Sequence, residues 1–185
     1  MNKIVPLIVP GLAAASTSYG ATLVSYDFNS ESSKTELLQL QGSASDLTVT
    51  SHFTISSGVA NATLDSIGTN SNIQTIKFTY TVMGLGAGET LDIDSLTIDL
   101  KGKGNGATAY ALNDTDADTR LGVTINPSTF TNLSQPGTRS GLVNGDEFIV
   151  RFGLRDNQAG SDAYEIDNFV LNGTIIAVPE PSAAA

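Results

Sequence analysis

The chain contains no cysteine and no tryptophan, and it has a single histidine, His52. The absence of cysteine excludes disulfide bonds, thiolate zinc sites, iron–sulfur clusters and cysteine nucleophiles. His52 lies among threonines on the outward side of an expected strand, and no Gly-x-Ser-x-Gly segment provides a nucleophile for it to activate. We therefore expect no catalytic histidine, and the sequence selects no other catalytic residue.

Charged residues are also scarce, at 15% of the chain, and most of them are acidic. The 9 lysine and arginine residues stand against 19 aspartate and glutamate residues, which gives a formal net charge of −10. A chain of this charge lacks the basic surface that nucleic-acid binding needs, and attraction to an anionic membrane surface is disfavoured. Thr, Ser, Asn and Gly fill the polar positions instead, a composition that favours strands and turns over helices.

The first 20 residues are predicted to be a secretory signal peptide. Lys3 gives a short positive start, and Ile4–Ala15 is an apolar run of 12 residues, a length typical of signal peptides and too short to span a bilayer as a helix. Cleavage after Gly20 places small residues at the positions that signal peptidase requires, and cleavage after Ala21 is the second choice. A buried N-terminal strand is the alternative interpretation of the apolar run.

The middle of the chain alternates apolar and polar residues in several runs, the pattern of half-buried antiparallel strands. The residues expected to point inward are Leu47, Val49, Phe53 and Ile55 of one strand, Ile76, Phe78, Tyr80 and Val82 of a second, and Phe148, Val150, Phe152 and Leu154 of a third. The run at 91–100 changes its alternation in the middle, between the pair Leu91 and Ile93 and the later apolar residues. A β-bulge near Asp94-Ser95 is the predicted cause.

Clusters of Gly, Asn, Asp and Ser separate these runs, and Asn144-Gly145 is the strongest hairpin signal among them. The only helix candidate is the segment 32–42, which fits a strand nearly as well. About eight to ten short strands at this spacing predict an all-β fold, a two-sheet antiparallel β-sandwich of jelly-roll type. We place this domain at residues 21–176, between the signal peptide at 1–20 and a linker at 177–185.

The chain carries a Pro-Glu-Pro motif at Pro179, Glu180 and Pro181. The segment Val178–Ser182 resembles the opening of the PEP-CTERM sorting signal of Gram-negative bacteria, in which the motif precedes a transmembrane helix and an arginine-rich cluster. Only the opening is matched, so residues 177–185 are interpreted as a linker and the start of a truncated signal, with no membrane span in the chain as given. The resemblance implies an exosortase as partner, a position at the cell surface or in the extracellular matrix, and a bacterium that makes exopolysaccharide.

The two ends of the domain carry a second resemblance. The stretches VSYDFNS, at 24–30, and YEIDNFVLNGTI, at 164–175, are similar to the opening and closing strands of extracellular jelly-roll modules, carbohydrate-binding ones among them. The resemblance implies that the first and last strands lie side by side and that an acidic residue from each holds a structural Ca²⁺. The four candidate calcium ligands are Asp27, Asn29, Glu165 and Asp167.

A second candidate metal site is the stretch NDTDADTR, in which Asp114, Asp116 and Asp118 occupy every second position. Alternate carboxylates in a loop can converge on a hard cation such as Ca²⁺. An EF-hand loop that began at Asp114 would need glycine at 119 and glutamate at 125, where this chain has Thr119 and Ile125. The stretch is kept as an alternative metal loop beside its simpler interpretation as a solvated acidic loop.

Three functions follow from these observations. The first is an exported, non-catalytic surface or matrix protein, and the alternatives are a carbohydrate-binding, lectin-like module and a polysaccharide-acting hydrolase or lyase. Sugar-binding modules usually present aromatic rings, for which Tyr110 and Tyr164 are the candidates because Tyr19 leaves with the signal peptide and Tyr80 faces the core. A hydrolase needs two paired carboxylates, and the sequence singles out no such pair.

Overall fold

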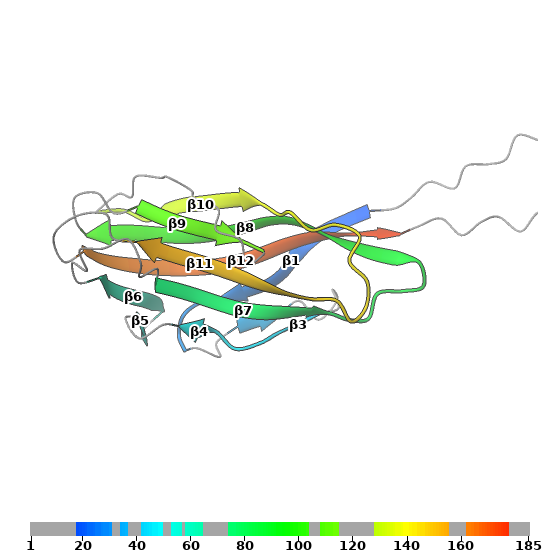
Figure 1. Cartoon of the computed structure of the whole chain (residues 1–185), viewed down its shortest axis with the longest axis horizontal. Coiled ribbons are helices and arrows are strands. Elements are labelled where there is room, and N and C mark those ends of the chain that lie inside the picture. Colours follow the sequence, from blue (N-terminus) through cyan, green and yellow to red (C-terminus); the bar gives the residue numbers. More distant parts are fainter. Residues whose placement is uncertain are drawn as a thin grey trace, which may run out of the picture.

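The computed structural model describes residues 18–30, 34–36, 42–49, 53–56, 58–64, 74–103, 108–114, 128–155 and 162–177. These residues form two antiparallel sheets that pack against each other, which confirms the predicted β-sandwich (Figure 1). None of them is helical, so this part of the chain offers no helix that could cross a membrane. The described strands extend from Ser18 to Ala177.

The larger sheet has seven strands in the described part of the chain, and the last strand of the sequence lies in its middle. Its strands are β1 (Ser18–Tyr26), β2 (Lys34–Glu36), β5 (Phe53–Ser56), β6 (Val59–Leu64), β8 (Glu89–Lys103), β10 (Thr131–Pro136) and β12 (Asp162–Ala177). They follow the order β10-β8-β12-β1-β2, with β6 also beside β12 and β5 beside β6. β1 pairs with β12 from Ser18 opposite Ile176 to Tyr26 opposite Phe169, so the expected adjacency of the first and last strands is confirmed.

The smaller sheet faces the larger one and has five described strands. They are β3 (Gly42–Ala44), β4 (Thr48–Val49), β7 (Gln74–Val82), β9 (Thr108–Asn113) and β11 (Glu147–Arg155). Their order is β3-β7-β11-β9, with β4 also paired to β7. From β7 to β12 the described strands alternate between the two sheets, and β12 lies between β1 and β8, an order typical of jelly rolls.

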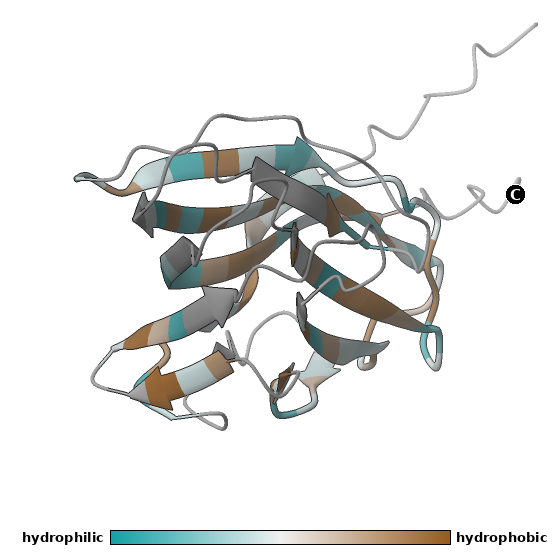
Figure 2. Cartoon of the chain, turned by 60° about the vertical axis from the view of Figure 1, so that its left-hand side comes forward, coloured by the Kyte–Doolittle hydropathy of each residue, from teal (hydrophilic) through white to brown (hydrophobic). Residues whose placement is uncertain are grey.

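The core lies between the sheets, where the alternating apolar residues meet. Every inward residue predicted for β7 and β11 is buried, and Figure 2 shows hydrophobic and hydrophilic bands alternating along the strands. The ring of Phe78, from the smaller sheet, lies 4.8 Å from the ring of Tyr26 and 5.4 Å from that of Phe169, measured between centroids. Because Tyr26 and Phe169 belong to the larger sheet, these aromatic contacts hold the two layers together.

The predicted bulge in β8 is confirmed. Ser95 pairs with Asn172 of β12, but the next pair joins Ile93 to Gly173, so Asp94 is an extra residue on the β8 side. The extra residue turns the apolar side chains on both sides of it toward the core, as bulges do. The buried apolar residues of this strand are Leu91, Ile93, Leu96, Ile98 and Leu100.

The prediction of one strand over residues 47–55 is wrong. Its first part forms β4, which pairs with β7 in the smaller sheet, whereas its last part forms β5, which pairs with β6 in the larger sheet. The inner faces of both sheets point at the same core, so apolar residues can keep an alternating pattern while the chain crosses from one sheet to the other. The helix candidate at 32–42 contains a strand, β2, in its described part, Lys34–Glu36.

Asn144-Gly145 forms a turn, but the prediction of a hairpin there is wrong. The N–H of Asp146 donates to the carbonyl of Val143 over 3.0 Å, and Gly145 has a φ of 94° whereas Asn144 has no positive φ. A positive φ at the third residue alone describes a type II turn, whereas two-residue hairpins use turns with a positive φ at the second residue. The turn lies between β10 of the larger sheet and β11 of the smaller one, so the two flanking strands do not pair with each other as the strands of a hairpin do.

Candidate functional site

An acidic patch, defined here as Asp27, Asp99 and Asp167, lies where β1, β8 and β12 run side by side. Asp27 directly follows β1, and Asp99 of β8 pairs with Asp167 of β12. Partial burial raises the pKa of the Asp167 carboxyl, and repulsion from Asp99 and Asp27 raises it further, while the backbone N–H of Asn168 acts in the opposite direction. The fold thus brings the predicted residues Asp27 and Asp167 into electrostatic reach of each other and adds Asp99.

Two unusual backbone conformations shape this patch. Phe28 and Asn168 have φ values of 54° and 52°, in the left-handed region that few residues other than glycine adopt. The Asn168 conformation accompanies a β-bulge, because the pairing of β12 with β8 shifts between Asp167 and Val170. Phe28 keeps its conformation with a fully buried side chain, so packing of the ring opposes the local strain.

Amide groups already occupy the carboxylates of two members of the patch. The two oxygens of Asp27 accept hydrogen bonds from the backbone N–H and the side-chain amide of Asn29, over 3.1 and 2.7 Å. The two oxygens of Asp99 accept from the side-chain amides of Asn132 and Asn168, over 2.8 and 2.9 Å. The patch is therefore a hydrogen-bonded surface network rather than a set of open carboxylates.

Asn29 and Glu165, the other two predicted calcium ligands, each have a side-chain partner in this structure. Asn29 is hydrogen-bonded to Asp27, whereas Glu165 forms an ion pair with Lys101, whose Nζ also lies 4.8 Å from the ring centroid of Phe130. Among the described residues, no group of three or more His, Cys, Asp or Glu side chains is arranged to hold a metal ion. Calcium binding at the patch stays a prediction. A cation that bound there would have to replace the hydrogen bonds from Asn side chains and backbone to Asp27 and Asp99.

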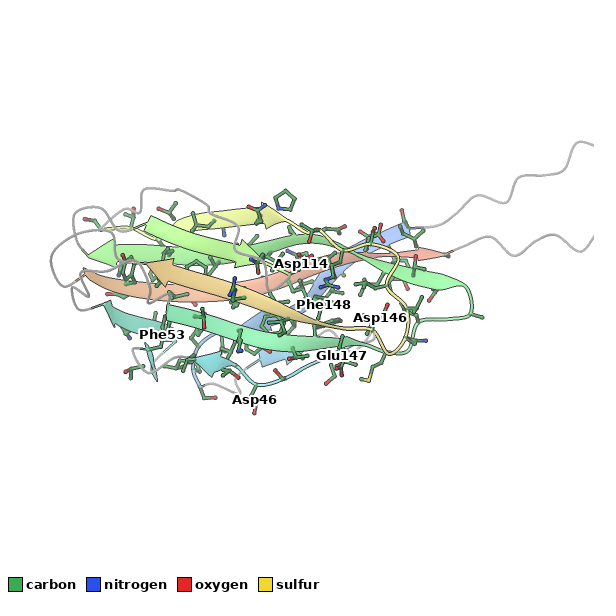
Figure 3. All side chains as sticks on the ribbon, in the orientation of Figure 1. Asp46, Phe53, Asp114, Asp146, Glu147 and Phe148 are labelled. Atoms are coloured by element: carbon green, nitrogen blue, oxygen red, sulfur yellow. The ribbon has the colours of Figure 1, made fainter. Side chains whose placement is uncertain are left out.

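Asp114, the first residue of the alternative metal loop, has a different role. Its side chain is only 1% exposed and lies where the end of β9 meets the segment that follows β10 (Figure 3). Its carboxylate accepts hydrogen bonds from the backbone N–H of Thr138 over 2.8 Å, from the Thr138 hydroxyl, and from the backbone N–H of Arg139 over 3.1 Å. Because β9 and β10 belong to different sheets, Asp114 connects the two layers.

Asp116 and Asp118 lie outside the described residues, so a metal loop there stays a prediction.

The Nε–H of Arg139 donates to the backbone carbonyl of Asp114 over 3.1 Å, which adds a fourth bond between Asp114 and the Thr138-Arg139 pair. We call the contact between Asp114 and the Thr138-Arg139 pair the Asp114 clamp.

The outer face of the larger sheet carries a row of short polar side chains that bond to one another. The hydroxyl of Thr22 donates to the amide oxygen of Asn172 over 2.9 Å, and the amide nitrogen of Asn172 donates to the hydroxyl of Ser95 over 3.1 Å. One step along the sheet, the hydroxyl of Thr174 donates to Asp94 over 2.7 Å. We call these five residues the outer polar row; it joins β1, β12 and β8 through side chains as well as backbone.

Of the two tyrosines considered for sugar binding, Tyr164 lies in the core. The side chain of Tyr164 is 1% exposed and therefore cannot stack on a ligand, so its candidacy was wrong, whereas Tyr80 is buried as expected. The side chain of Tyr110 lies outside the described residues. Phe130, which sequence reasoning missed, is 41% exposed beside Lys101, and no local pattern distinguishes it from a core phenylalanine.

His52 and the motif at Pro179, Glu180 and Pro181 lie outside the described residues. No protein-family model matches this chain, and no curated protein matches it.

Proposed function

We propose that the protein is exported, has no catalytic activity, and serves as a structural β-sandwich at the cell surface or in the extracellular matrix of a Gram-negative bacterium. Its sorting signal is the motif at Pro179, Glu180 and Pro181, handled by an exosortase. The observation that carries the proposal is the antiparallel pairing of β1 with β12: the chain enters the sandwich at Ser18 and leaves it at Ala177, at the same end (Figure 1). The two points at which a leader and a tail would join the described strands therefore lie side by side.

The outer polar row supports the structural half of the proposal. Its side chains form three hydrogen bonds with one another, two that connect β1, β12 and β8 through Asn172 and one between β12 and β8 from Thr174 to Asp94. Such a polar face keeps a secreted domain soluble and links its strands. Side chains that are bonded to one another are also less available to bind or activate a substrate. The net charge of −10 acts in the same direction, because like-charged molecules resist association.

The sorting proposal is tested by locating the protein in the bacterium that produces it. Cell, surface and matrix fractions are compared between the parent strain, a strain without its exosortase, and a strain carrying Glu180→Ala. The expected result is that the protein shifts out of the surface or matrix fraction in both altered strains. Glu147→Ala is the matched control, since Glu147 is an exposed acid on the smaller sheet. An unchanged distribution in the strain without exosortase refutes the sorting mechanism.

Carbohydrate binding is the second candidate, and one observation favours it. Phe130 is exposed next to Asn132, whose amide holds Asp99, so an apolar ring and hydrogen-bonding groups share one edge of the larger sheet. Sugars are commonly bound by this combination of ring stacking and polar contacts. Retardation in gels containing exopolysaccharide tests the idea: Phe130→Ala should abolish it and Met83→Ala, which also alters an exposed apolar residue, should not.

A further inference from the structure

We infer that the leader is cleaved after Ala15, so that the mature protein begins at Ser16 and retains the whole of β1. The inference rests on the proposed export and revises the cleavage position expected after Gly20. In the reaction, water hydrolyses the Ala15–Ser16 peptide bond: the hydroxyl goes to the carbonyl carbon of Ala15, and the proton goes to the nitrogen of Ser16. A signal peptidase of the exporting cell is the catalyst.

The first support is the register of β1. Ser18, Tyr19 and Gly20 pair with Ile176, Ile175 and Thr174 of β12, in the same antiparallel ladder that continues to Tyr26. Cleavage after Gly20 would therefore remove the first third of a nine-residue strand of the folded protein.

A cut after Gly20 would also leave part of β12 without a neighbouring strand on one side. Ile175 is only 1% exposed, and Tyr19 is its direct partner across the ladder, so their side chains lie on the same side of the sheet. β12 would keep β8 on one side, with Leu91 opposite Ile175, but would become an open edge on the other side. Unpaired backbone groups at such an edge invite association with other strands, and proteins generally avoid this.

The sequence upstream of Ser18 supplies a better cleavage motif. Ala13-Ala14-Ala15 is an Ala-x-Ala segment, the preferred small-residue pattern before a signal-peptidase cut, whereas cleavage after Gly20 uses Ser18 and Gly20. The apolar run that remains ahead of it, Ile4–Leu12, has nine residues, within the range of about 7–15 that leaders use. Cleavage after Ala15 thus fits the motif that signal peptidase prefers and leaves β1 complete.

The test is to express the full 185-residue chain in a Gram-negative host, recover the exported protein and determine its N-terminus by Edman sequencing and peptide mass spectrometry. The expected N-terminus is Ser16. An exported protein that begins at Ala21 or Thr22 overturns the cleavage position and leaves the export proposal intact. A protein that stays in the cytoplasm with Met1 overturns both.

Two variants separate the competing positions. Ala15→Leu puts a bulky residue next to the inferred cut, so the uncleaved precursor should accumulate. Ser18→Leu puts one at a position needed only for cleavage after Gly20, so processing should continue. Because Ser18 is exposed, we expect the fold to tolerate the change. Normal processing of Ala15→Leu together with blocked processing of Ser18→Leu would overturn the inference.

Discussion

Removal of the Asp114 carboxylate should destabilise the sandwich more than the removal of any exposed acid. In Asp114→Ala, the backbone N–H groups of Thr138 and Arg139 and the Thr138 hydroxyl all lose their acceptor. Water can replace the carboxylate only in part, because Asp114 itself is 1% exposed although Thr138 is exposed. Of the four bonds in the Asp114 clamp, the bond from the Nε–H of Arg139 to the backbone carbonyl of residue 114 is the one that the substitution leaves in place.

The magnitude follows from the number and type of the lost bonds. A hydrogen bond to a charged group contributes about 1.5–3 kcal/mol, and a buried donor left without a partner costs about 1–3 kcal/mol. The terms overlap because two of the donors belong to Thr138, and relief of the buried charge offsets part of them, so we expect a net loss of about 3 kcal/mol. Asp114→Asn keeps one acceptor oxygen and turns an amide toward the donors, so its loss should be intermediate, about 1–2 kcal/mol.

Urea unfolding followed by circular dichroism measures these losses as changes in the free energy of unfolding. Asp146→Ala is the matched control, since Asp146 also accepts from a backbone N–H, that of Val143 at 2.8 Å, but in an exposed turn. Its loss should stay below about 1 kcal/mol. If Asp114→Ala and Asp146→Ala lose the same free energy, the Asp114 clamp has no special role in joining the sheets.

Three further predictions concern the acidic patch and the glycines. Burial, together with repulsion from Asp99 and Asp27, raises the pKa of Asp167 in the folded state above its usual 3.8. Its stabilising contribution is therefore present below that pH and is lost as pH rises through the folded pKa. Asp167→Asn should raise the melting temperature at pH 7 and leave it unchanged at pH 3, and a lower melting temperature at pH 7 would contradict the raised pKa. Millimolar Ca²⁺ should raise the melting temperature of the wild type but not of Asp167→Asn, and no rise in the wild type would end the calcium prediction. Gly137→Ala should lower the free energy of unfolding, measured in urea, by about 2 kcal/mol or more, because its Cβ would overlap the Ile93 carbonyl. Gly141→Ala should lower it by about 1 kcal/mol, since Gly141 has open space around it but a φ of 67°. Equal losses would show that the backbone near Ile93 moves to make room.

The parts of the fold that the sequence predicts well are those with long alternating runs. Residues 75–82 alternate polar and apolar side chains throughout, and in β11 Phe148, Val150, Phe152 and Leu154 keep one phase although Ile149 is also apolar. Side-chain burial at these positions follows directly from the two-residue period of a strand. The bulge at Asp94 is predictable for the same reason: a change of phase within a run requires one extra residue.

The assignment of strands to sheets is not predictable in this way. Alternation reports which side chains point to the core, and in a sandwich both sheets share that core, so β4 and β5 look like one strand in the sequence. The turn at Asn144-Gly145 fails similarly, because its composition predicts a turn but does not say whether the flanking strands pair with each other. Both depend on long-range pairing, which local patterns do not record.

The acidic patch shows the same limit at the level of a site. Asp27 and Asp167 were expected to be near each other because the ends of the domain resemble known first and last strands. Asp99 was not expected there, since its position depends on the register of β8 against β12 and on the bulge at Asn168. A change of one residue in that register would turn Asp99 to the other face of the sheet.

Asp114 shows why an acidic stretch in a sequence is a weak guide to metal binding. A sandwich whose chain crosses between sheets leaves some backbone N–H groups without a strand partner, and buried ones must be satisfied by another acceptor. Thr138 and Arg139 lie in such a crossing segment, and the acceptor comes from a residue 24 positions earlier in the chain. A carboxylate there can be required by the backbone alone, so the spacing of Asp114, Asp116 and Asp118 does not distinguish a cation ligand from a structural acceptor. The response of Asp114→Ala to urea, measured with and without Ca²⁺, does make that distinction.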